Sequence, residues 1–128
     1  MRKNISSESM WEKRYSYSRV VVNGNRAYVA GTVSVDEEGT IVGRSKPEVQ
    51  AEFILNKIEK YINQAGFKKE DIVRTRAFTT DIRHSEEIGH VHGAFFKGID
   101  PAFTMVEVQA LIHKDLLVEI EADLEKAE

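Results

Sequence analysis

The strand-like sequence "LLVEIEADL" (residues 116–124) constrains the fold more than any other part of the chain. Apolar residues form one side of it and mostly acidic residues form the other: Leu116, Val118, Ile120 and Ala122 against Leu117, Glu119, Glu121 and Asp123. This period-two alternation is typical of a strand with one face in the core, whereas strands covered on both faces are continuously apolar. The chain is therefore expected to build a sheet with helices on one face only.

Four other stretches have the β-branched and aromatic residues typical of strands. Two lie in "YSRVVVNGNRAYVAGTVSV" (17–35), joined by a turn at Asn23–Asn25 in which Gly24 supplies the positive φ of a tight hairpin. The other two are "DIVRTRAFTT" (71–80) and "TMVEVQALI" (104–112). With the last strand they make five predicted strands.

Two helices are predicted between these strands. Residues 47–65 carry an apolar stripe at helical spacing, with Ser45 and Glu48 spaced as a capping box and Gly66 suited to the helix end. Ser85 is expected to cap a shorter helix, whose apolar face is Ile88, Val91, Phe95 and Phe96. The order β-β-α-β-α-β-β predicts a single α+β domain over residues 1–128, with both helices packed on one face of the sheet.

The other face of the sheet mixes charged and large apolar side chains. By the same alternation, Arg74 and Arg76 are expected to share this face with Glu119. The alternation adds Ile72, Phe78, Met105 and Glu107 to it. One interpretation is a solvated face with surface ion pairs. The other is a covered surface, which large apolar residues among charges favour, and a second copy of the chain is then the expected cover. Arginines there would neutralise buried carboxylates such as Glu107.

Composition excludes several classes of function. The chain has no cysteine, so thiol catalysis, disulfides and thiolate metal sites are excluded. A net charge of −3 gives no electrostatic footprint for nucleic acid or an anionic membrane. The first residues lack the apolar segment of a signal peptide, and no run is long enough to span a bilayer. A cytoplasmic protein with no membrane contact is the expectation.

Few residues remain as candidates for chemistry. The chain has neither a Gly-rich phosphate-binding loop nor a G-x-S-x-G sequence. His90 and His92 are two residues apart and point to different sides of a helix, so no metal site is expected, and His92 is interpreted as a half-buried structural residue. Glu119 remains: a carboxylate on a covered face activates water if burial raises its pKa.

Three ordered motifs, "YSRVVVNGNRAYVAGTVSVD", "NQAGFKKEDIVRTRAFTTDI" and "PAFTMVEVQALI…LLVEIEA", resemble the RidA family, also called YjgF/YER057c/UK114, over nearly the whole chain. The resemblance implies a chorismate-mutase-like fold assembled as a homotrimer, whose sheets form a central barrel with three clefts at subunit interfaces. It also implies, for the active branch, cofactor-free hydrolysis of reactive enamines and imines to 2-keto acids and ammonia.

The resemblance also suggests site residues. Tyr17 matches the family's cleft tyrosine, Glu119 the carboxylate that positions the attacking water, and Gly31 the glycine closing a strand, where Ala30 replaces the serine of the active branch. Phe103, in "PAFTM" with Thr104, stands where the active branch has an arginine that grips the substrate carboxylate. A phenylalanine cannot make those two charge-assisted hydrogen bonds.

The chain therefore resembles the arginine-lacking subgroups of the family. The role of its other arginines then has two interpretations. Arg19 or Arg76 supplies the positive charge from another strand, or these arginines are structural and neutralise buried glutamates.

Two functions follow from the resemblance. One is an imine or enamine hydrolase with an altered substrate range, and the other is a non-catalytic trimer that binds a small metabolite for regulation or sequestration. Some family members are described as ribonucleases. RNA binding is not expected of this acidic chain.

Overall fold

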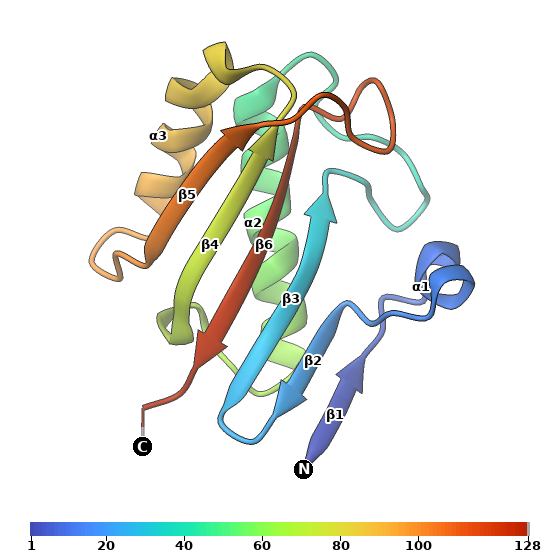
Figure 1. The fold of residues 1–128 in the computed structure, drawn as a ribbon, viewed down its shortest axis with the longest axis vertical. Coiled ribbons are helices and arrows are strands. Elements are labelled where there is room, and N and C mark those ends of the chain that lie inside the picture. Colours follow the sequence, from blue (N-terminus) through green and yellow to red (C-terminus); the bar gives the residue numbers. More distant parts are fainter. Residues whose placement is uncertain (128) are drawn as a thin grey trace.

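The computed structural model describes residues 1–127 and contains one six-stranded sheet (Figure 1). The strands are β1 (Arg2–Ile5), β2 (Val20–Asn23), β3 (Arg26–Val33), β4 (Ile72–Thr79), β5 (Ala102–Glu107) and β6 (Val118–Glu125). The helices are α1 (Met10–Tyr15), α2 (Pro47–Gln64) and α3 (Ser85–Phe95). Across the sheet the order is β1-β2-β3-β6-β4-β5, antiparallel except for the β4–β5 pair, which α3 connects.

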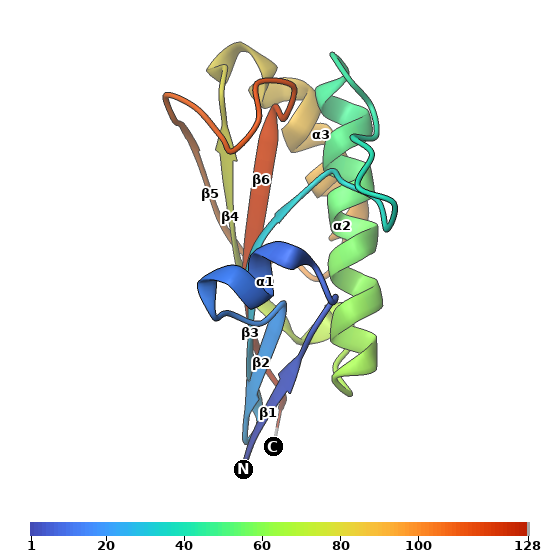
Figure 2. The same ribbon diagram turned by 90° about the vertical axis from the view of Figure 1, so that its right-hand side faces the viewer.

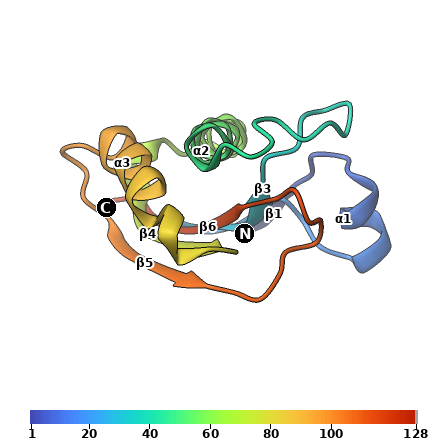
Figure 3. The same ribbon diagram turned by 90° about the horizontal axis from the view of Figure 1, so that it is seen from above.

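Helices α2 and α3 cover one face of the sheet, as predicted, and within residues 1–127 no helix lies over the other face (Figures 2 and 3). The alternation in β6 is confirmed, because Val118, Ile120 and Ala122 are buried whereas Glu119 and Glu121 are only partly so. The face that carries α2 and α3 is called the helix face below, and the other is called the open face.

No helix in the described part of the chain is long and apolar enough to cross a membrane.

The predicted order of elements is correct, but it missed β1 and α1 in the polar leader. β1 pairs with β2 in antiparallel register, and α1 lies beyond this edge of the sheet (Figure 1). Ser9 caps α1 by accepting a hydrogen bond from the Glu12 N–H (3.2 Å). Because Ser9 and Glu12 have the spacing of a capping box, the sequence did contain a signal for α1.

Several predicted boundaries are confirmed and others are wrong. Gly24 begins the two-residue loop of the β2–β3 hairpin with φ +66°, and Gly66 follows α2 with φ +88°. Ser45 does not cap α2: it has φ +63° in a turn closed by Lys46 N–H to Gly43 C=O (3.0 Å), and no side chain caps this helix. Ser85 is the first residue of α3 and not its cap.

Three residues predicted for the open face lie elsewhere. Ile72 is buried on the helix face, because a bulge shifts the β4–β6 register between Ile72 and Arg74. Met105 packs against the core beneath the helices. Glu107 forms no ion pair within residues 1–127 and instead accepts a hydrogen bond from the Ile82 N–H (2.9 Å), at the start of the short turn after β4. Both sides of β5 are similarly apolar, so alternation could not decide which one faces the helices.

Candidate functional site

Glu119 lies on the open face of β6, and its carboxylate rests against the backbone of Gly31. A Cβ atom at position 31 would overlap the Glu119 carboxylate, so only glycine leaves room for it in this conformation. Gly31 occupies the place where the β3–β6 register shifts, between Val29 and Thr32. The bulge in β3 therefore creates the space that the Glu119 side chain fills.

The Glu119 carboxylate is half-buried, and it accepts no hydrogen bond and forms no ion pair within residues 1–127. Burial raises its pKa above the usual value, the Arg19 guanidinium opposes this by lowering the pKa, and the Glu121 carboxylate adds to the rise. A carboxylate in this condition binds a proton more readily than an exposed one. This is the property expected of a group that removes a proton from water.

Tyr17 follows α1, and its N–H donates to the Glu12 C=O (3.1 Å). Tyr17 as a whole residue is 40% exposed, and the Arg19 guanidinium carbon lies 5.7 Å from the centre of its ring. Ser16, which follows the last residue of α1, has φ +59°, so the chain leaves the helix through a left-handed turn before β2. The local fold therefore presents Tyr17 at the surface and keeps Arg19 inside.

Arg19 is buried and bonded to groups of its own chain. Its Nη1 donates to the Gly31 C=O (2.7 Å) and to the Thr32 hydroxyl (3.0 Å), and its Nε lies 3.6 Å from the Glu12 carboxylate. Glu12 in turn accepts from the Ser6 hydroxyl (3.0 Å), the Ser7 N–H (3.1 Å) and the Ser7 hydroxyl. These contacts favour a structural role for Arg19, with Glu12 as the carboxylate that it neutralises.

Arg76 and Thr104 lie opposite each other on β4 and β5, on the open face. Arg76 Nη1 is 3.1 Å from the Glu121 carboxylate and 3.5 Å from the Asp123 carboxylate, and Arg74 reaches Asp123 at 3.9 Å. Arg76 is therefore already paired with acidic residues of the neighbouring strand β6.

Phe103 lies on the helix face of β5, opposite to Glu119. Its ring stacks on His92 of α3, with 3.8 Å between ring centres and an angle of 12°, and the residue as a whole is 38% exposed. His92 Nε2 is 2.7 Å from the Thr75 hydroxyl, and burial lowers the pKa of His92 to about 4. The interpretation of His92 as a structural residue agrees with this geometry. Within one chain, Phe103 does not meet Tyr17 or Glu119.

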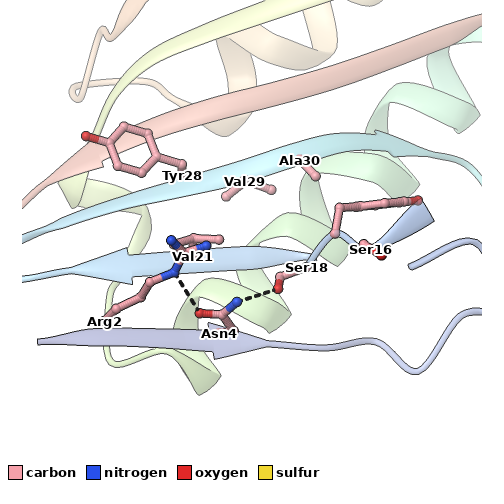
Figure 4. A pocket seen from close by; sticks show the side chains of 9 residues that line it. Arg2, Asn4, Ser16, Ser18, Val21, Tyr28, Val29 and Ala30 are labelled. Carbon is pink, nitrogen blue, oxygen red and sulfur yellow. Dashed lines mark hydrogen bonds between the residues drawn. The ribbon is translucent and has the colours of Figure 1, made fainter. Parts of the chain in front are cut away.

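A hollow of about 320 Å³ opens on the open face over β1, β2 and β3 (Figure 4). Its lining includes the predicted site residues Tyr17 and Ala30, and Ala30 precedes the Gly31 that contacts Glu119. Arg2 and Asn4 of β1 also line it, and sequence reasoning missed them because a four-residue strand within a polar leader gives no periodic signal. Among the described residues, no cluster of three or more histidines and carboxylates could hold a metal ion.

The model of the Endoribonuclease L-PSP family matches residues 8–125. Among curated relatives, a RutC family protein of Sulfurisphaera tokodaii is 31% identical over 104 residues, which cover 81% of this chain and 82% of that protein.

Two solved structures are also similar to this chain. Rv2704 from Mycobacterium tuberculosis, a member of the YjgF/YER057c/UK114 family, has 40% identity and a TM-score of 0.90, with 98% of this chain and 100% of that chain covered. Escherichia coli TdcF with bound serine has 27% identity and a TM-score of 0.78, with 87% and 88% covered. These similarities confirm the chorismate-mutase-like fold.

Proposed function

Because the chain belongs to the Endoribonuclease L-PSP family, whose solved relatives include members of the YjgF/YER057c/UK114 family, we propose that it hydrolyses a small reactive imine or enamine to a 2-oxo acid and ammonia. One observation carries this proposal: the half-buried Glu119 carboxylate lacks partners within residues 1–127, and burial raises its pKa. Glu119 is its catalytic base, and Tyr17 lines the cleft next to it.

The chemistry needs one carboxylate and one water molecule. An enamine first becomes the imine, as a proton moves from its nitrogen to its terminal carbon. Glu119 then accepts a proton from water while the water oxygen attacks the C=N carbon, and that proton passes to the nitrogen to give a carbinolamine. Glu119 then takes the hydroxyl proton of the carbinolamine and passes it to the nitrogen. The C–N bond breaks as the C=O bond forms, and neutral ammonia leaves. The products are a 2-oxo acid and ammonia, and no oxidant or reductant takes part.

The complete cleft in this proposal lies between copies in a homotrimer. Its support is the open face, where Phe78 and Val106 share the surface with the ion pairs of Arg74 and Arg76, and where no helix of the described chain lies. In a trimer, Phe103 of one copy lies against Tyr17 and Glu119 of its neighbour. This arrangement reconciles the separation of these residues within one chain with a shared role.

The proposed substrates are small. Serine bound to TdcF is a ligand of amino-acid size, which supports this class by analogy at 27% identity. Phe103 gives the cleft a neutral aromatic wall, so the substrate range differs from that of relatives with an arginine at this position. RNA cleavage is left out of the proposal, because a net charge of −3 attracts no polyanion.

The test is turnover of freshly generated 2-aminoacrylate, followed as pyruvate release. Replacing Glu119 by Gln keeps the shape and removes the base, and the expected result is a fall in turnover of about 10²- to 10⁴-fold with the oligomer unchanged by light scattering. Glu125→Gln, at the exposed end of β6, is the matched control and should stay within about twofold of the wild type. Turnover that survives Glu119→Gln contradicts the role of Glu119. Absence of turnover in the wild type favours a binding protein instead.

A further inference from the structure

The hollow over β1, β2 and β3 contains one ionised side chain, Arg2. Its other lining residues are polar and uncharged or apolar: Asn4, Ser16, Tyr17, Ser18, Val21, Tyr28, Val29 and Ala30. Hydroxyl groups and an amide therefore surround a single cation, and no carboxylate lines the hollow. A site of this composition attracts an anion.

The Arg2 side chain is oriented by a short chain of hydrogen bonds. Its Nε donates to the Asn4 Oδ1 (3.2 Å), and the Asn4 Nδ2 donates to the Ser18 hydroxyl (2.9 Å), as Figure 4 shows. The two terminal nitrogens of the guanidinium form no hydrogen bond or ion pair within residues 1–127. They remain available to a ligand in the planar, two-donor geometry that suits a carboxylate.

The other arginines near the site are already paired. Arg19 is bonded to Gly31, Thr32 and the Glu12 carboxylate, and it is buried. A second set on the open face is paired with acids of β6, namely Arg74 and Arg76. Either set would have to give up an existing ion pair before it could bind a ligand. Arg2 gives up no ion pair.

We propose that Arg2 is the anion anchor of this protein, and that it binds the carboxylate of a small 2-oxo acid or its imine in the hollow beside Tyr17. This inference rests on the proposed function for the identity of the ligand but not for the anion site itself. The hollow lies close to Glu119 along strand β3, because Ala30 lines the hollow and the next residue, Gly31, contacts Glu119. Arg2 thereby takes over, from a different strand, the charge that Phe103 cannot supply.

The test measures binding of pyruvate to the wild-type protein by titration calorimetry, with methyl pyruvate as the uncharged analogue and inorganic phosphate as a second anion. Arg2→Gln is expected to weaken pyruvate binding about ten- to a hundredfold, because a charge-assisted pair of hydrogen bonds is lost. Arg2→Lys is expected to fall between the two, since it keeps the charge and loses the fork. Methyl pyruvate binding should be the same in all variants.

The matched control is Arg26→Gln, which removes the same charge from the exposed Arg26–Glu125 pair outside the hollow. It should change pyruvate binding by less than about twofold. Equal effects of Arg2→Gln and Arg26→Gln overturn the proposal, as does a wild-type protein that binds pyruvate no more tightly than methyl pyruvate. Phosphate that binds as well as pyruvate and depends equally on Arg2 keeps the anion site but overturns its assignment to a carboxylate.

Failure of this inference can be separated from failure of the proposed function. If Glu119→Gln abolishes turnover while Arg2→Gln changes neither KM nor pyruvate binding, the proposed function stands and the role of Arg2 is wrong. If the wild type shows no turnover but pyruvate binding still depends on Arg2, the anion site stands and the proposed reaction is wrong.

Discussion

Two carboxylates that feel the charge of Arg19, those of Glu12 and Glu119, have opposite environments. Glu12 is 4% exposed, and its side chain accepts hydrogen bonds from Ser6 and Ser7 and lies 3.6 Å from the Arg19 guanidinium. Glu119 is half-buried against Gly31 and has none of these partners within residues 1–127. A buried charge with its hydrogen bonds satisfied stabilises a local structure, whereas one without them is costly to keep and needs another explanation.

The difference separates the two regions by role. The Glu12 region, with its serines and Arg19, fixes the segment that leads to Tyr17, whose N–H donates to the Glu12 C=O (3.1 Å). The Glu119 region leaves a carboxylate with a raised pKa on the open face. The first region thus positions residues, and the second is where the proposed function places proton transfer.

The largest effect is expected from Glu12→Ala, which leaves Arg19 buried without its carboxylate. The free energy of unfolding should fall by about 3 kcal/mol, the cost of breaking a buried ion pair by removing one partner. Urea unfolding followed by circular dichroism measures it. Glu125→Ala, in the exposed pair with Arg26, should cost less than about 0.5 kcal/mol. Equal costs would contradict the contrast between the two regions.

His92 is a buried basic side chain, and it can be compared with the two carboxylates through its effect on stability as the pH changes. Its pKa is about 4 in the folded protein and about 6.5 in the unfolded chain, so the unfolded state binds the extra proton between these values. The stability that neutral His92 provides is therefore complete above pH 6.5 and is lost as the pH falls toward 4. Between pH 7 and pH 4 the wild type should lose about 2 kcal/mol more than His92→Gln, measured by urea unfolding at each pH. Parallel curves for the two proteins would contradict this.

Glu119→Gln should change stability in the opposite sense to Glu12→Ala. Because burial raises the folded-state pKa of Glu119, the folded protein binds the extra proton, and stability falls as the pH rises through that pKa. At pH 7 the Gln variant should be more stable than the wild type by about 0.5–1 kcal/mol, and the gain should vanish near pH 4. Thermal unfolding at the two pH values measures the difference. A loss of stability at pH 7 would mean that Glu119 is a satisfied charge like Glu12.

The smallest effect on stability is expected from Gly31→Ala, although its effect on chemistry is large. The new Cβ would displace the flexible end of Glu119, which should cost less than about 1 kcal/mol but lower turnover at least tenfold. In a Glu119→Ala background, Gly31→Ala should no longer lower the stability, because the Glu119 carboxylate that its Cβ would displace is absent. A cost that persists in the double variant would place the strain in the backbone and not in the contact with Glu119.

Sequence periodicity predicted most of the fold and part of the site. The stripe in 47–65 and the alternation in β6 were sufficient for α2 and for the side of the sheet on which Glu119 lies. The sheet face predicted for Met105 and Glu107 was wrong. Both sides of the edge strand β5 are similarly apolar, so its orientation depends on the packing of its side chains, here Phe103 stacking on His92. Local patterns do not contain that information.

The sequence by itself determined helices α2 and α3 and five of the strands, since these depend on spacing between neighbours in the chain. Only the tertiary structure decided which charges are satisfied. The bulge at Gly31 makes room for Glu119, the turn at Ser16 takes Arg19 to Glu12, and the pairing of β1 with β2 brings Arg2 to the hollow beside Tyr17. These contacts join different elements of the fold, and whether a charge is costly or stable depends on such partners.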